Sequence, residues 1–196
     1  QYNVSDDFNA ETNMTIRYDL DKDGQTEIIV GFQGQEGSEV VVPWSFIAIG
    51  KEKNDTLDLE YVIPGNNYFY KIELKDMDND GLYEIIFWQN GGVHYTNLDI
   101  LKYHNGILEL LFSNGSACSI EIEGNSYPYR IKIGRENWEK EGWDYASGEP
   151  LWQVYVWNGK EFIFSEKLST VGREIDEKEA IQKYVDKVKG YLEKKK

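Results

Sequence analysis

Cysteine, proline and long apolar runs are scarce in this sequence. Among its 196 residues there are one cysteine, Cys118, and four prolines. A single cysteine excludes an internal disulfide, and the small residues around Cys118 match neither a metal-binding nor a redox motif. No run of about 18 apolar residues occurs, which predicts that the chain has no transmembrane segment. With so few prolines and 40% hydrophobic residues, the composition is that of a folded chain.

Basic residues are also in short supply relative to acidic ones. The chain has 21 lysines and arginines against 35 aspartates and glutamates, a formal net charge of −14. So negative a surface repels phosphate backbones and anionic lipid headgroups. We therefore expect no nucleic-acid partner. The length fits a single domain, on a scale of roughly 100–200 residues per domain.

Two acidic segments of the chain align with each other without a gap. Residues 19–29 read DLDKDGQTEII and residues 76–86 read DMDNDGLYEII, 57 positions apart. Each segment follows a run of alternating residues and precedes a β-branched or aromatic run, which predicts strands on both sides. We therefore expect each acidic segment to connect two neighbouring strands.

Asn-Gly pairs mark further hairpins. Asn105-Gly106 and Asn158-Gly159 each lie between two alternating runs, and both residues of such a pair tolerate positive φ. A weaker pair, Asn54-Asp55, has the corresponding place earlier in the chain. These turns predict a mostly β domain over residues 1–170, with three repeats of about four antiparallel strands at residues 14–67, 68–125 and 126–170. The third repeat lacks the acidic loop.

The end of the sequence changes period. Apolar residues recur there at helical spacing, namely Ile181, Tyr184, Val185, Val188 and Leu192. This spacing predicts a C-terminal α-helix within residues 171–196. An apolar stripe of this kind fits a helix that packs on the sheets, and a helix that extends from them to bind a partner is the alternative.

The two acidic segments have the residue pattern of a calcium loop. Carboxylates at positions 1, 3 and 5 point inward as the chain bends, and glycine at position 6 permits the sharp turn. The expected ligands are Asp19, Asp21, Asp23, the carbonyl of Gln25 and Glu27 in one loop, and Asp76, Asp78, Asp80, the carbonyl of Leu82 and Glu84 in the other. Oxygen-only donors favour Ca²⁺ over zinc, and Mg²⁺ is disfavoured because it retains waters in an octahedral shell. Position 12 is Val30 or Phe87 rather than glutamate, which excludes a helix–loop–helix hand.

This nine-residue loop between strands resembles the calcium loops of FG-GAP and VCBS-type repeats, which occur in integrin-like β-propellers and in secreted bacterial proteins. The resemblance covers about residues 14–125. It implies two Ca²⁺ sites, propeller-blade-like repeats and an extracellular location, with Glu27 and Glu84 in place of the usual final aspartate. Three repeats are fewer than the roughly 4–8 blades of a closed propeller. A partial propeller, a ring completed by a second chain and an open β assembly are therefore the alternatives.

Aromatic residues gather late in the chain. Trp138, Trp143 and Tyr145 lie in the segment of the third repeat that stands in place of an acidic loop. Flat rings in a loop can stack on sugar rings, which predicts a glycan-binding face as one alternative. In the other interpretation, the two loop tryptophans cover an edge of the core.

Signals for catalysis are weak. Acidic pairs of the kind that glycosidases use, such as Glu136 and Glu141, are unavoidable in so acidic a chain, and no Gly-x-Ser-x-Gly nucleophile motif occurs. The favoured function is a non-catalytic binding or assembly module, secreted or attached to the cell surface and stabilised by two Ca²⁺ ions. Its expected partner is a protein or glycan at the cell surface, or further copies of the chain in a homo-oligomer or polymer. A secreted hydrolase is the remaining alternative.

Overall fold

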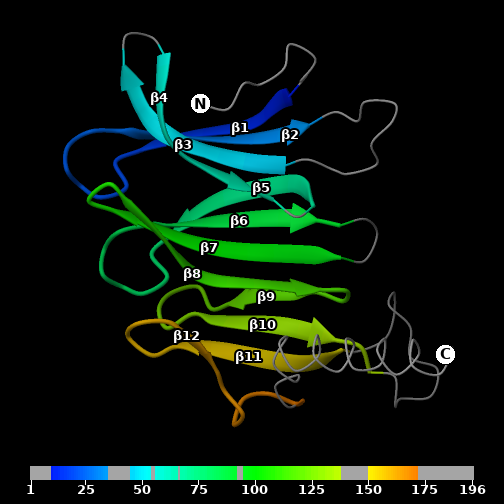
Figure 1. Ribbon diagram of the computed structural model, residues 1–196. Coiled ribbons are helices and arrows are strands. Elements are labelled where there is room, and N and C mark those ends of the chain that lie inside the picture. The colour runs from blue at the N-terminus through cyan, green and yellow to red at the C-terminus, as the bar shows by residue number, and fades with distance from the viewer. Residues whose placement is uncertain are drawn as a thin grey trace, which may run out of the picture.

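Three antiparallel sheets make up the described part of the protein. The structure is a computed structural model that describes residues 10–34, 45–53, 56–65, 67–91, 95–137 and 150–171. Within these residues, twelve β-strands form three sheets of four strands each (Figure 1). The prediction of a mostly β chain with three groups of about four antiparallel strands is confirmed for this part of the chain.

In each sheet the strands are neighbours in the order in which they occur along the chain. The first sheet contains β1 (Ala10–Tyr18), β2 (Glu27–Gly34), β3 (Ser45–Lys53) and β4 (Thr56–Pro64). The second contains β5 (Tyr68–Lys75), β6 (Glu84–Asn90), β7 (Thr96–His104) and β8 (Ile107–Ser116). The third contains β9 (Ile120–Glu123), β10 (Arg130–Arg135), β11 (Leu151–Trp157) and β12 (Phe162–Phe164).

The third sheet begins earlier in the chain than the sequence predicts. We expected the third unit to begin at residue 126, but β9 already pairs with β10 in the third sheet. Gly124, whose φ is 110°, turns the chain between these two strands. The turn signal at residues 124–129 therefore marks a connection inside the third sheet.

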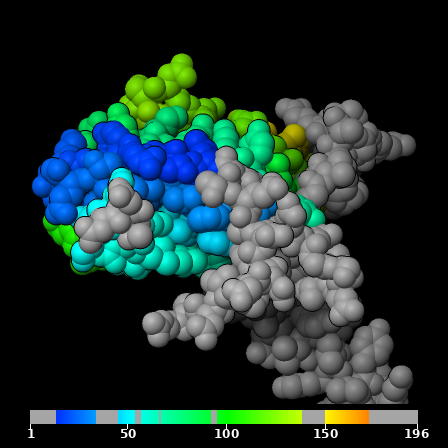
Figure 2. Space-filling model, turned by 90° about the horizontal axis from the view of Figure 1, so that it is seen from above, coloured from blue at the N-terminus to red at the C-terminus, as the bar shows by residue number. Residues whose placement is uncertain are grey.

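The sheets are stacked face to face, with the second sheet in the middle (Figure 1). One buried core lies between the first and second sheets and includes Ile29, Ile47 and Phe87. Another lies between the second and third sheets and includes Ile100 and Ile131. The middle sheet thus packs on both faces, as the unbroken burial of β6 from Glu84 to Gln89 shows. Figure 2 looks down on the stack from the side of the first sheet.

The first two sheets repeat each other down to their irregularities. The pairing of β1 with β2 shifts register between Thr12 and Met14, and the pairing of β5 with β6 shifts between Phe69 and Lys71. The pairing of the third strand with the fourth also shifts register in both sheets, after Ile49 in the first sheet and after Ile100 in the second. The register shifts thus fall at equivalent positions in the two sheets.

The two predicted Asn-Gly hairpins differ in conformation. Asn105 and Gly106 both have positive φ, 50° and 72°, as expected for a tight hairpin between β7 and β8. In the turn between β11 and β12, Gly159 has positive φ but Asn158 does not. There the Asn158 side chain instead accepts hydrogen bonds from two following backbone N–H groups, at 2.8 and 2.9 Å. An asparagine can therefore close a turn through its side chain as well as through its backbone.

Several predictions concern residues outside the described ranges. Trp138, Trp143 and Tyr145 belong to the connection between β10 and β11, and the predicted C-terminal helix covers residues after Val171. The glycan-binding face and the C-terminal helix stay predictions. The placement of the aromatic segment was wrong, because it connects the second and third strands of its sheet, whereas residues 124–129 take the place of an acidic loop between the first and second strands. The described residues contain no helix, and accordingly none of the length and apolarity that a membrane span requires.

Candidate metal centre

The predicted ligands lie on two loops at the same end of the stack. Loop 1 (residues 19–27) connects β1 with β2, and loop 2 (residues 76–84) connects β5 with β6. Both loops lie on the left in Figure 1. Each ends in a glutamate that is the first residue of the following strand.

The two loops are direct neighbours. Tyr18, just before loop 1, stacks on Tyr83 of loop 2, with ring centroids 5.1 Å apart and planes 6° from parallel. Lys22 of loop 1 also reaches loop 2, because its Nζ lies 3.4 Å from the position that a Cβ would take at Gly81. A cation in one loop is therefore close enough to affect the charge balance of the other.

Both loops have the same backbone conformation. Gly24 and Gly81, at position 6, have φ of 86° and 87°. Lys22 and Asn79, at position 4, have φ of 57° and 63°. The two left-handed residues bend the chain tightly, which only glycine does without a steric cost.

The loops also share their internal hydrogen bonds. At position 1, Asp19 Oδ2 accepts from the Gly24 N–H and Asp76 Oδ2 accepts from the Gly81 N–H, both at 3.0 Å. The position 3 aspartates accept from the N–H two residues on, at 3.3 and 3.2 Å, and the position 5 aspartates do likewise at 2.7 and 2.8 Å. Each bond uses one carboxylate oxygen and orients the side chain while the second oxygen stays available for other contacts.

The terminal glutamates fasten the loops to the sheets. Glu27 and Glu84 are both fully buried. Glu27 Oε2 accepts from the Leu20 N–H at 2.8 Å, and Glu84 Oε2 accepts from the Met77 N–H at 2.6 Å. The side chains of Leu20 and Met77 are themselves fully buried, one in each inter-sheet core. The position of each loop is thus tied to the packing of neighbouring sheets.

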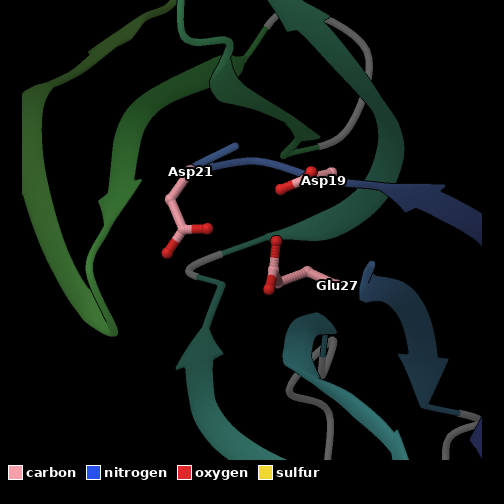
Figure 3. A group of neighbouring side chains, drawn as sticks. All are labelled: Asp19, Asp21 and Glu27. Carbon is pink, nitrogen blue, oxygen red and sulfur yellow. The ribbon is translucent and has the colours of Figure 1, made fainter. Parts of the chain in front are cut away.

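Three carboxylates converge in each loop. Oxygens of Asp19, Asp21 and Glu27 all lie within 4.8 Å of one another (Figure 3), and the same holds for Asp76, Asp78 and Glu84. Within the described residues, these are the two acidic groups with that geometry. Carboxylates so close repel one another unless a cation lies among them.

Some buried carboxylate oxygens in both groups accept no hydrogen bond. Oδ1 of Asp19 and Oδ1 of Asp76 are inaccessible to solvent and accept no hydrogen bond. Oε1 of Glu27 and Oε1 of Glu84 accept none either, although a lysine Nζ lies 3.2 Å from the first and 3.5 Å from the second. Because a buried charged oxygen is costly without a partner, these atoms fit the ligand shell of a metal ion.

Each group has a lysine beside it. Lys51 Nζ lies 3.2 Å from Asp23 Oδ2 and 3.2 Å from Glu27 Oε1. Lys102 Nζ lies 2.6 Å from Asp78 Oδ2 and also pairs with Asp80 and Glu84. The acidic groups are therefore partly neutralised by the chain itself.

Burial and charge shift the pKa values of these groups. Burial raises the pKa of Glu84 to about 7, and the charges of Asp78 and Asp80 add to the rise, against the opposing effect of the Met77 N–H and Lys102. Burial likewise raises the pKa of Glu27. Burial alone would lower the pKa of Lys102, but its hydrogen bonds to the loop aspartates outweigh this and raise it. A bound cation would favour the charged form of both glutamates.

The structure brings together part of each predicted ligand set. Asp19, Asp21 and Glu27 converge in loop 1, and their counterparts Asp76, Asp78 and Glu84 converge in loop 2. Asp23 and Asp80 direct a carboxylate oxygen to a lysine instead. Coordination by the carbonyls of Gln25 and Leu82 remains a prediction.

Four residues of the site were missed in the sequence. Leu20 and Met77 follow the first loop aspartate, and their apolar character in an acidic segment was the available signal. Lys51 and Lys102 both lie three residues before the asparagine of a predicted hairpin turn. That shared offset placed them in the same strand position, but only the strand pairing shows that they face the loops.

The aromatic residues of the third sheet divide into two groups. Tyr155 is buried in the core and packs edge-on against Phe112, with ring centroids 5.1 Å apart. Trp152 lies beneath Lys132, whose Nζ is 4.3 Å from the ring centroid. Tyr155 thus belongs to the core, and the aromatic residues of the predicted glycan face, Trp138, Trp143 and Tyr145, lie outside the described ranges.

Comparison with family models, with curated proteins and with solved structures finds no match to this chain. The similarity of the loops to FG-GAP and VCBS-type repeats thus has no support beyond the loops and strands themselves. The function proposed below is therefore derived from the geometry of the two acidic groups.

Proposed function

We propose that this chain is a non-catalytic scaffold whose first two sheets are stabilised by two Ca²⁺ ions and which serves as a binding or assembly module outside the cell. In this proposal the three sheets are propeller-blade-like repeats, and the first two are of the FG-GAP or VCBS type. The observation that supports it most is the matched pair of carboxylate groups, in which buried oxygens accept no hydrogen bond.

The donor set favours calcium among metal ions. Each group consists of carboxylate oxygens, with no cysteine or histidine, which is the donor type that hard cations prefer. Two left-handed residues and the shared hydrogen bonds hold each loop in the bent form before any ion binds. Such preorganisation lowers the cost of ordering the loop on binding. An extracellular location follows in this proposal because millimolar Ca²⁺ suits sites of the weaker class.

The loops link metal binding to the stack. Leu20 contributes to the core between the first and second sheets, and Met77 contributes to the core between the second and third. An ion that fixes the loop backbone therefore restrains a side chain in each core. In the same proposal, partner proteins, glycans or further copies of the chain bind to the faces and loops of the stabilised stack.

Thermal unfolding with Ca²⁺ and with a chelator tests this proposal. At a Ca²⁺ concentration tenfold above the dissociation constant, each site adds about 1.4 kcal/mol to the free energy of unfolding. For two sites we expect Tm to be about 5–10 °C higher in Ca²⁺ than in EDTA. Sedimentation of the same samples reports whether the ion also promotes assembly.

A double variant and a matched control complete the test. Asp21→Ala with Asp78→Ala removes one carboxylate from each group and should abolish most of the Tm response. Glu121→Ala with Glu123→Ala removes two acids from β9 of the third sheet, which pair with Lys132 rather than with a loop, and should leave the response intact. An identical melting curve of the wild type in Ca²⁺ and in EDTA would contradict the proposed function.

A further inference from the structure

A lysine occupies the same structural position beside each acidic loop. Lys51 in β3 pairs across the strands with Glu27, the last residue of loop 1. In the second sheet, Leu101 pairs with Ile85, so the next residue, Lys102 in β7, lies opposite Glu84 of loop 2. The third sheet, which lacks an acidic loop, has Tyr155 at the corresponding distance before its Asn158 turn. Within the described residues, lysine at this position thus accompanies the acidic loop.

The two lysines differ in how tightly they hold their loops. Lys102 pairs with three carboxylates of loop 2, at 2.6 Å from Asp78, 2.5 Å from Asp80 and 3.5 Å from Glu84, and its side chain is 12% exposed. Lys51 pairs with two carboxylates of loop 1, both at 3.2 Å, and its side chain is 23% exposed. The ammonium group is therefore closer to the carboxylates and more shielded from water in loop 2.

We propose that Lys51 and Lys102 are tethered cations that compete with the metal ion for the loop carboxylates, so that they set the metal affinity of each loop and make loop 2 the weaker site. This inference rests on the proposed function, because it concerns the affinity of the same two sites. It adds that each site has a resident positive charge supplied by a neighbouring strand.

Geometry explains the competition. One carboxylate oxygen of Asp80, Oδ1, accepts a backbone hydrogen bond within the loop, and the other, Oδ2, accepts from Lys102. The two oxygens of Asp23 are divided in the same way between a loop N–H and Lys51. The position 5 carboxylate is thereby kept from the group formed by positions 1, 3 and 9. When a divalent ion enters, the lysine must either withdraw or remain as a like charge beside the ion. In bulk water, a unit positive charge about 5 Å from a divalent ion lowers its affinity by on the order of tenfold.

The same lysines also explain how the loops stay folded without metal. Glu27 and Glu84 are fully buried, and an uncompensated charge there is costly. An ammonium group at 3.2–3.5 Å compensates that charge in part. Removal of the lysine should therefore lower the stability of the metal-free protein and raise the affinity for the metal ion.

Calorimetric titration with CaCl₂ tests the inference one loop at a time. Asp21→Ala disables loop 1 and leaves loop 2 to be measured, and Asp78→Ala does the reverse. In the first background, we expect Lys102→Met to raise the Ca²⁺ affinity of loop 2 about tenfold. In the second, we expect Lys51→Met to raise the affinity of loop 1 by a smaller factor. Without these lysine changes, loop 1 should bind more tightly than loop 2.

Charge and fold controls accompany these variants. Lys102→Arg keeps the positive charge and should return the affinity to the level of the parent. Lys132→Met removes a lysine that pairs with Glu121 and Glu123 on the third sheet, and it should leave both affinities unchanged. If Lys102→Met does not fold without calcium, Lys102→Gln is measured instead, because the amide retains a hydrogen-bond donor without the charge.

The outcomes separate the inference from the proposed function. Tighter binding in Lys102→Met, with parent affinity in Lys102→Arg, supports the inference. Equal or weaker binding in Lys102→Met, with measurable binding in its parent, overturns the inference while the calcium sites stand. No heat of binding in any background at millimolar Ca²⁺, including the wild type, overturns the proposed function and the inference together.

Discussion

The first two sheets and the third sheet join their opening strands in different ways. Acidic connections of eight residues, 19–26 and 76–83, join β1 with β2 and β5 with β6, whereas β9 and β10 are joined by the six residues 124–129. The opening strands differ too, since β1 and β5 have nine and eight residues but β9 has four. The same stack of sheets is thus built with and without acidic loops.

The acidic loops add side chains to the cores that the third sheet supplies from its strands. The third sheet contributes Ile131 and Ile133 to its core from within β10. The first two sheets add Leu20 and Met77 to the cores from their loops. Close carboxylates in those loops oppose this packing unless a cation or a lysine balances them. We therefore expect cation dependence to be strongest in the first two sheets.

The largest expected effect comes from the loop anchors. Leu20→Ala and Met77→Ala each remove a fully buried side chain from an inter-sheet core. We expect each change to lower the free energy of unfolding by about 2–5 kcal/mol, measured by urea denaturation in Ca²⁺. A loss below about 1 kcal/mol would show that the loops are not fastened to the cores.

Calcium should protect the sheets unequally. Hydrogen exchange compares the amides of β1–β2 and β5–β6 with those of β9–β10, in Ca²⁺ and in EDTA. At a Ca²⁺ concentration tenfold above the dissociation constant, exchange that requires opening of a loaded loop should slow about tenfold. The turn at Gly124 should be unaffected. Equal protection of all three sheets would contradict the comparison.

Three glycines with similar positive φ should differ in their effect on Ca²⁺ affinity. Gly24, Gly81 and Gly159 all have φ between 86° and 97°, where a side chain is strained. Substitution by alanine should cost about 1 kcal/mol of unfolding free energy at each position. Only Gly24→Ala and Gly81→Ala should also weaken Ca²⁺ binding in a calorimetric titration. If Gly159→Ala weakens binding as much, the two acidic loops are not the sites.

The smallest effect concerns a buried acid away from the loops. Asp99 accepts from Gln89 Nε2 at 2.6 Å, and its burial raises its pKa, against the opposing effect of hydrogen bonds from Ser113 and Gln89. The folded protein therefore binds this proton more readily than the unfolded chain, and the contribution of Asp99 to stability falls as pH rises above the ordinary carboxyl pKa near 3.8.

Asp99→Asn removes this titration. The stability of the wild type relative to the variant should be highest at acidic pH and should decline toward neutral pH, as measured by urea denaturation over a pH series. The Tm response to Ca²⁺ should be the same in both proteins. A smaller calcium response in Asp99→Asn would mean that buried acids in general, and not the two loops, cause the response.

Much of the site could be predicted because its determinants are local. The spacing of Asp19, Asp21 and Glu27, with Gly24 at position 6, fixes a turn whose geometry depends on a few consecutive residues. The strands on both sides were equally visible as alternating runs. Local patterns of this kind determine turn type and strand position without reference to the rest of the chain.

The rest depends on contacts between distant segments. Nothing near Lys102 in sequence shows that it faces Glu84, because that contact follows from the register of β7 on β6. The burial of Leu20 likewise follows from the stacking of one sheet on another. The unit boundary was misplaced for the same reason, since the assignment of β9 to the third sheet is a matter of strand pairing.

The most direct test of the account is an anomalous difference map from crystals grown in millimolar Ca²⁺. We expect one peak among Asp19, Asp21 and Glu27, a second among Asp76, Asp78 and Glu84, and none beside the third sheet. A well-resolved map without a peak at either group would contradict the claim that these loops bind a cation.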